Sequence, residues 1–155
     1  MSAPSLKDRI TDDMKAAMRA READRLGAIR MLLAAVKQKE VDERIVLDDA
    51  QVTAIVDKLI KQRRDSISQF EQAGREDLAS RERAEIEVLS VYLPVQADPA
   101  EIEAAIEAAI AETAATGPQD MGKVMGLLKT RLAGRTDLAA VSGKVGALLK
   151  ARAGR

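Results

Sequence analysis

The pattern of apolar and polar positions is helical along the whole chain. Apolar residues recur three and four positions apart in one segment after another, which is the period of an amphipathic helix. No segment shows the strict alternation of a half-buried strand. We therefore expect an all-α protein.

Four helices are expected before residue 94, and their caps mark where they begin. Ser5 and Asp48 are good N-caps, Gly74 is a good C-terminal stop, and Pro94 ends the fourth helix. The second and fourth helices should start near residues 24 and 77, with a loop over 42–48. Short connections favour an antiparallel hairpin or bundle. The positions expected to face the core are Leu6, Ile10, Met14, Ala17, Met18, Leu26, Ile29, Leu33, Val36, Val52, Val56, Leu59, Ile67, Phe70, Leu78, Ile86, Leu89 and Leu93.

The segment Pro94–Pro99 predicts a domain boundary. One proline ends a helix, and Asp98 followed by Pro99 is an N-cap with proline at the first helical position. We expect an N-terminal domain over 1–94 and a C-terminal domain over 95–155. The second should hold three helices, starting at Pro99 and after the caps Asp120 and Asp137. Their expected core positions are Ile102, Ile106, Ile110, Met121, Val124, Leu128, Leu132, Leu138, Val141, Val145 and Leu148.

Composition narrows the chemistry. The chain has no cysteine and no histidine, which excludes thiolate sites, Ser-His triads and the commonest metal ligand. Acidic pairs such as Asp12-Asp13 and Asp48-Asp49 fit helix capping, and no phosphate-binding loop is present. We expect no catalytic residue, no metal and no cofactor, and hence a non-catalytic protein.

Two features bear on location. The N-terminus carries charged residues and no apolar signal core, and the longest uncharged run, 88–97, is about half of a membrane span. These features predict a cytoplasmic protein with no membrane partner. The net charge is zero, so any surface for a polyanion has to be local.

Charge separates inside the C-terminal domain. Residues 98–119 contain five acidic residues and no basic one, whereas residues 120–155 contain eight basic and two acidic residues, a net charge of plus six. The basic positions predicted to meet nucleic acid are Lys123, Lys129, Arg131, Arg135 and Lys144. They could neutralise phosphates, or they could only complement helix dipoles and keep the domain soluble. No aromatic residue lies here, so contacts would be to backbone and shape rather than to stacked bases.

Four glycines interrupt the last two predicted helices. Gly122 and Gly126 stand on one, and Gly143 and Gly146 on the next. Each glycine costs a helix about 1 kcal/mol against alanine, so close packing between the helices is the expected compensation. Alternatively, Gly122 exposes backbone N–H groups to an anion.

A basic cluster also marks the third predicted helix. It consists of Lys58, Lys61, Arg63 and Arg64, and an exposed, salt-bridged face is the expected role. Arg63 differs because it falls in line with the apolar stripe. It could reach a buried carboxylate or a partner, or extend its head outward to water.

Six blocks in order resemble the GatB/YqeY family. They are 6–18, 30–38, 59–67, 69–75, 91–94 and the stretch Asp120-Met-Gly-Lys-Val-Met-Gly126. The family resembles the helical tail of the B subunit of the glutamine-dependent amidotransferase that corrects mischarged tRNA, where a small C-terminal helical domain is associated with recognising the tRNA body. Residues 122–126, Lys129, Arg131, 134–135 and 141–142 are the matching positions, while Gly146 departs from the basic or polar residue expected there.

The resemblance implies a protein that binds tRNA or structured RNA through its C-terminal domain. Two alternatives stay open. One is a protein-interaction adaptor whose N-terminal hairpin docks a partner. The other is an accessory subunit of a carbon–nitrogen ligase that uses glutamine as amido donor, with a translation-related protein as partner.

Overall fold

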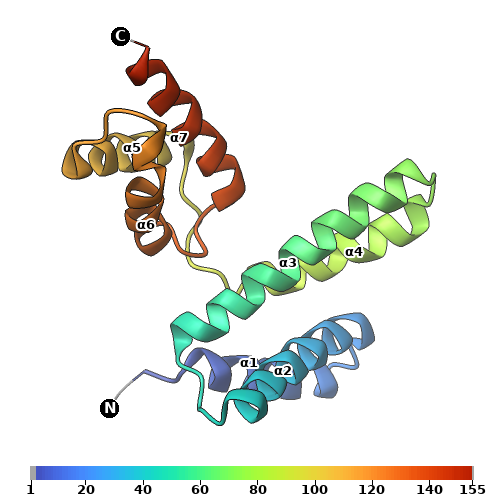
Figure 1. The fold of residues 1–155 in the computed structure, drawn as a ribbon. Helices are drawn as coiled ribbons and strands as arrows, with labels where there is room; N and C mark the ends of the chain where they lie inside the picture. The colour runs from blue at the N-terminus through green and yellow to red at the C-terminus, as the bar shows by residue number, and fades with distance from the viewer. Residues whose placement is uncertain (1–2, 155) are drawn as a thin grey trace. The chain divides into compact units, whose positions relative to one another are not determined.

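The computed structural model describes residues 3–154 and confirms the all-α prediction (Figure 1). Seven α-helices and one 3₁₀ turn form within that range, and none of those residues is in a strand. The chain separates into two compact units, Met1–Leu93 and Pro94–Arg155, with four and three α-helices. The helices are α1 (Leu6–Arg19), α2 (Ala23–Glu43), α3 (Asp49–Gln72), α4 (Glu76–Ser90), α5 (Pro99–Thr113), η1 (Pro118–Asp120), α6 (Met121–Arg131) and α7 (Leu138–Ala153).

The N-terminal unit is a pair of helical hairpins (Figure 1). Helices α3 and α4 form a long antiparallel hairpin, α1 pairs with α2, and α2 packs against both α3 and α4. The core is aliphatic apart from one tyrosine. Its buried members are Ile10, Ala17, Ile29, Leu32, Val36, Leu47, Val52, Ile55, Val56, Ile60, Leu89 and Tyr92.

Three details differ from the sequence expectation. Helix α2 runs to Glu43, past the start of the expected loop, and ends where Arg44 turns left-handed at φ 55°. Leu32, not Leu33, is fully buried. Met18, in the last turn of α1, is 46% exposed. For the leucine and the methionine, the position of the neighbouring helix decides which apolar residue of the stripe is covered.

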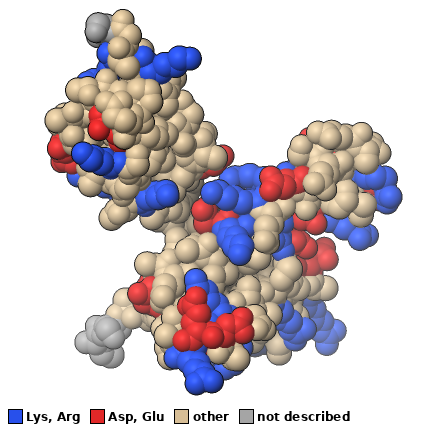
Figure 2. All heavy atoms as spheres, viewed as in Figure 1, with Lys and Arg blue, Asp and Glu red and all other residues tan. Residues whose placement is uncertain are grey.

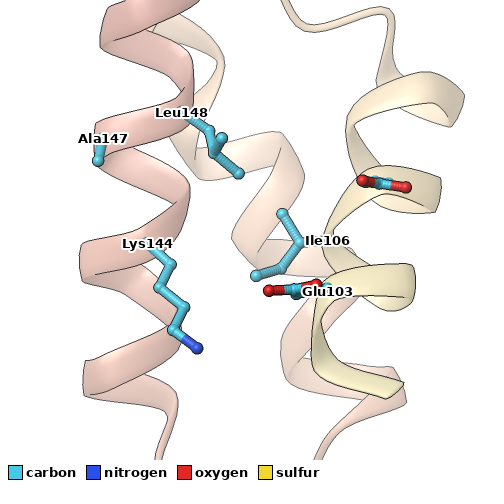
Figure 3. Close-up of a pocket in the computed structure, with 6 residues that line it drawn as sticks. Glu103, Ile106, Lys144, Ala147 and Leu148 are labelled. Carbon is cyan, nitrogen blue, oxygen red and sulfur yellow. The ribbon is translucent and has the colours of Figure 1, made fainter. Parts of the chain in front are cut away.

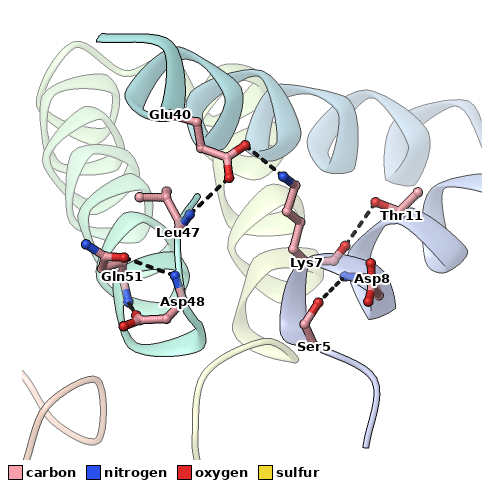
Figure 4. A network of polar contacts seen from close by, with 8 residues as sticks. All are labelled: Ser5, Lys7, Asp8, Thr11, Glu40, Leu47, Asp48 and Gln51. Atoms are coloured by element: carbon pink, nitrogen blue, oxygen red, sulfur yellow. Dashed lines mark hydrogen bonds and ion pairs between the residues drawn. The ribbon is translucent and has the colours of Figure 1, made fainter. Parts of the chain in front are cut away.

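Two predicted N-caps of the N-terminal unit, Ser5 and Asp48, are confirmed. The Ser5 hydroxyl accepts the Asp8 N–H at 3.1 Å. Asp48 and Gln51 form a reciprocal capping box, with bonds of 2.8 and 3.0 Å, at the start of α3 (Figure 4). These bonds satisfy N–H groups that have no partner inside the helix.

A buried carboxylate joins three segments of this unit (Figure 4). Glu40, in the last turn of α2, accepts the Lys7 ammonium of α1 at 2.7 Å and the Leu47 N–H of the loop before α3 at 3.0 Å. The Lys7 hydrogen bond and then the Leu47 N–H lower the pKa of Glu40, because both favour the ionised form. This one side chain therefore positions the entrance to α3 against α1 and α2.

Arg63 and Tyr92 make the other inward polar contacts of the unit. Arg63 is 7% exposed; it donates to Glu85 of α4 at 2.7 Å and to the Leu59 carbonyl at 2.9 Å. It therefore reaches a carboxylate as predicted, but the Glu85 side chain is 36% exposed rather than buried. The Tyr92 hydroxyl donates to Asp13 of α1 at 2.6 Å. Burial and then this hydrogen bond raise the pKa of Tyr92, so the ring stays neutral and fastens the end of the unit to α1.

The C-terminal unit has its own aliphatic core. Its buried residues are Ile106, Ala109, Ile110, Ala115, Val124, Leu128, Leu132, Val141, Val145 and Leu149. Leu148 was expected in this set, but it is 45% exposed while Leu149 is fully buried. Val141, Val145 and Leu149 are each four apart, so they continue one face of α7 and leave Leu148 on its flank.

We expect the Glu40 contacts to make the stability of the N-terminal unit depend on pH. The folded-state pKa of Glu40 lies below its ordinary 4.5, so its stabilisation is present above that value and is lost as pH falls through the folded-state pKa. Glu40→Gln should lower the melting temperature near neutral pH, and the deficit should shrink below about pH 4. Fluorescence of Tyr92, the only tyrosine, follows this unit. A deficit that is equal at all pH values, or equally large in the exposed Glu87→Gln control, would contradict the charge-based role.

Candidate nucleic-acid interface

The helix that carries most of the predicted basic residues, α6, is entered through a 3₁₀ turn. Asp120 was expected to be its N-cap, but its side chain makes no capping bond to α6. It accepts the Thr116 N–H at 2.9 Å instead, because Pro118 begins a helical turn before α6 and Asp120 is already in it, at φ −92° and ψ 2°. The Thr116 N–H is the main reason that the pKa of Asp120 is lowered.

Helix α5 pairs two of the five predicted arginines and lysines inside the unit. Arg131 forms an ion pair with Glu112. Arg135 pairs with Glu101 at 2.7 Å and also donates to the Val95 carbonyl at 2.9 Å. The Arg135 carbonyl in turn accepts the Ala97 N–H at 2.8 Å. Arg135 thus fastens the segment before α5 to the end of α6, and its charge is partly neutralised.

The other three predicted residues are exposed lysines. Lys123 and Lys129 lie on α6, and no ion pair forms at either among the described residues. Lys144 lies on α7 beside two carboxylates of α5, in a groove described below. The five residues therefore differ in their contacts: two pair with α5, two form no ion pair among the described residues, and one lies beside two carboxylates. In the view of Figure 2, lysines and arginines of the C-terminal unit form separate groups divided by uncharged surface.

The glycines of α6 and α7 do not pack against a neighbouring helix, so that prediction is wrong. A Cβ built on Gly122, Gly126, Gly143 or Gly146 would meet no atom of another helix within 4 Å in the part of the chain that the structure describes. The helices of this unit contact one another through Val124, Leu128 and the valine and leucine face of α7 instead. The cost of each glycine, about 1 kcal/mol against alanine, is not offset by any contact among the described residues.

Two lysines and two glycines share the solvent side of α6. Gly122, Lys123, Gly126 and Lys129 are all exposed and lie opposite the buried Val124 and Leu128, as the period of the helix requires. We call these four residues the α6 face. It offers two ammonium groups beside two glycines whose Cβ positions are open, a surface that a phosphate backbone could approach closely.

Some surface residues were not singled out from the sequence. Lys150 and Arg152, in the last turn of α7, are also exposed and basic. The sequence showed their charge, but it did not show that they lie on the surface of the unit.

Within residues 3–154 no group of acidic side chains is arranged to hold a metal ion. In the same range no helix combines the length and apolarity needed to cross a bilayer.

These features define an all-helical protein of two small units with a lysine-bearing helix in the second. The chain belongs to the YqeY-like protein family, whose model matches residues 7–149. This agrees with the resemblance found in the sequence blocks.

Several fungal proteins named "Altered inheritance of mitochondria protein 41, mitochondrial" are similar to the chain. The protein from Lachancea thermotolerans is 40% identical over 110 residues, which cover 68% of this chain and 58% of the relative. Those from Vanderwaltozyma polyspora and Pyrenophora tritici-repentis are 38% and 30% identical, over 61% and 82% of this chain and 53% and 71% of the relatives. The chain thus spans about half the length of the first two.

The names of these relatives contradict the prediction of a cytoplasmic protein. They are named as mitochondrial proteins. The prediction rested on the lack of an apolar signal core, which is the mark of secretory signals only. Mitochondrial targeting sequences are amphipathic and rich in arginine and serine, so the absence of an apolar core was no argument for the cytoplasm.

If the α6 and α7 glycines have no packing role, alanine should stabilise the C-terminal unit. We expect Gly126→Ala and Gly143→Ala each to raise the free energy of unfolding by about 0.5–1 kcal/mol, measured by amide hydrogen exchange in α6 and α7. Gly134→Ala is the matched control; it should destabilise, because φ is 70° there. Destabilisation by the first two substitutions would restore the packing explanation.

Proposed function

We propose that the protein binds structured RNA, with tRNA as the leading class, through the α6 face. Lys123 and Lys129 contact phosphates, and Gly122 and Gly126 allow the sugar-phosphate backbone to approach the helix. The observation that carries the proposal is that two exposed lysines, which form no ion pair with any residue of 3–154, flank two glycines whose Cβ positions are open. The resemblance of this segment to the amidotransferase tail supports the same assignment.

The lack of aromatic residues in the C-terminal unit limits how it could bind RNA. The chain's only aromatic residues, Phe70 and Tyr92, belong to the N-terminal unit, so the α6 face has no platform for stacking bases. Contacts to phosphates and to the shape of a folded RNA are what lysines and open backbone can supply. Arg131 and Arg135 then act mainly by holding α6 against α5.

The amidotransferase link is a narrower prediction, and it rests on the resemblance alone. The described residues supply no geometry for amide transfer. An RNA-binding role for the YqeY-like chain does not require that reaction.

Neutralising the two lysines tests the RNA proposal. We expect Lys123→Gln with Lys129→Gln to weaken binding of the full chain to unfractionated tRNA. The plot of log affinity against log salt should become shallower by about 1 for each phosphate that is no longer neutralised. Fluorescence anisotropy at several salt concentrations measures both. The matched control is Lys58→Gln with Arg64→Gln, two exposed basic residues of α3.

Two outcomes would overturn this proposal. One is no binding of tRNA by the unsubstituted chain even at low salt. The other is an equal loss of affinity in the α3 control, which would mean that any exposed positive charge contributes in the same way. A single-stranded DNA of similar length serves as a competitor, and it should compete poorly if shape is recognised.

The glycines give a second, charge-independent test. Gly126→Gln adds a good helix former with no charge, so it should leave the fold intact while its side chain covers the open backbone of the α6 face. We expect tRNA affinity to fall several-fold with an unchanged salt slope, measured by the same anisotropy titration. Unchanged affinity would show that the backbone of α6 is not approached by the RNA.

A further inference from the structure

A groove lies between α5 and α7 in the C-terminal unit, apart from the α6 face. It has a volume of about 450 Å³ and is lined by Glu103, Ile106, Glu107, Lys144, Ala147 and Leu148 (Figure 3). Ile106, 2% exposed, lies at its base, and Leu148, 45% exposed, lies on its α7 wall. An apolar floor with one half-exposed leucine is the usual form of a site for an apolar anchor.

The rims of the groove carry opposite charges. Glu103 and Glu107 are four residues apart on α5, which places them one above the other on the same side of the helix. Lys144 stands on the facing wall, from α7 (Figure 3). No ion pair is formed by these three side chains among the described residues.

The positions of the glutamates around α5 explain why, among the described residues, Glu103 and Glu107 form no ion pair while Glu101 and Glu112 do. Glu101 and Glu112 are eleven residues apart, about three helical turns, so they share one flank and pair with Arg135 and Arg131. Glu103 and Glu107 lie on the other flank, which faces α7. Like charges four apart disfavour a helix slightly, and no basic residue of the described chain relieves this pair with an ion pair.

We propose that this groove docks an amphipathic helix of a protein partner. The helix places an apolar side chain over Ile106 against Leu148, a lysine or arginine flank toward Glu103 and Glu107, and an acidic residue toward Lys144. Charge complementarity selects this occupant: a phosphate backbone would meet two carboxylates, whereas a helix with one basic and one acidic flank matches both rims.

This proposal changes the role that the sequence suggested for Lys144. From the sequence it belonged with the RNA-binding residues, but its position opposite two carboxylates makes it part of a peptide-binding rim. The groove and the α6 face have no residue in common, so RNA and a protein helix do not compete for the same side chains. Failure of one proposal therefore leaves the other untouched.

The test uses the full chain and a synthetic helical peptide as probe. The peptide has about 14 residues, roughly four turns, with a leucine face, lysines on one flank and glutamates on the other. A second peptide exchanges lysines and glutamates while keeping the leucines in place. In an NMR titration we expect the amide shifts to concentrate in 103–107 and 144–148, with affinity for one of the two peptides about three- to tenfold higher than for the other.

Two variants distinguish binding in the groove from non-specific binding of the peptides. Glu103→Lys with Glu107→Lys makes both rims of the groove basic, so it should abolish the preference between the two peptides. Leu148→Gln should weaken both, while the control Val46→Gln, at a residue of the N-terminal unit that is 82% exposed, should weaken neither. Far-UV circular dichroism of each variant checks that the helices persist.

The proposal would be overturned by shifts spread over both units, by equal affinity for the two peptides, or by a preference that survives the double charge reversal. Shifts confined to the groove, together with loss of the preference in the Glu103→Lys, Glu107→Lys variant, would support it. Binding of tRNA is measured separately and decides only the role of the α6 face.

Discussion

The pairing of acidic α5 with arginines of α6 and of the turn after it is the interaction that shapes the two proposed surfaces of the C-terminal unit. Glu101 and Glu112 lie on one flank of α5 and hold Arg135 and Arg131. These pairs partly neutralise two arginines, and Arg135 also fastens the segment before α5 through its hydrogen bonds with Val95 and Ala97. The same register turns Glu103 and Glu107 toward α7, where they line a groove. One helix thereby separates a lysine-bearing face from a mixed-charge groove.

The N-terminal unit shows how a core almost without aromatic residues is held in register. Leucine, isoleucine and valine stripes tolerate small rotations of a helix, because neighbouring positions are equally apolar. A few inward polar contacts remove that freedom. Glu40 joins α1, α2 and the loop before α3, Arg63 joins α3 to α4, and Tyr92 joins the end of the unit to α1. Each bond would lose its partner if its helix turned by one residue.

The glycines of α6 and α7 acquire a different meaning in the structure. Glycines inside helices usually indicate close contact between backbones, and that contact is missing here. Because no internal contact among the described residues offsets the cost of these glycines to helix stability, a role at the surface of the unit is the better explanation. On α6 the open backbone lies between Lys123 and Lys129, which is why the RNA proposal rests on that helix rather than on the total charge of the segment.

Sequence alone determined the all-α class, most helix starts and the family resemblance, because capping residues, prolines and a 3.6-residue period are local signals. It also placed Arg63 correctly on the apolar stripe. Only the tertiary structure decided that Arg131 and Arg135 are paired and that Leu148 is exposed while Leu149 is buried. Only the structure could show that the Asp120 side chain accepts the Thr116 N–H instead of capping α6. These depend on where one helix sits against another, and the spacing of residues within a helix does not specify the rotation of its neighbour.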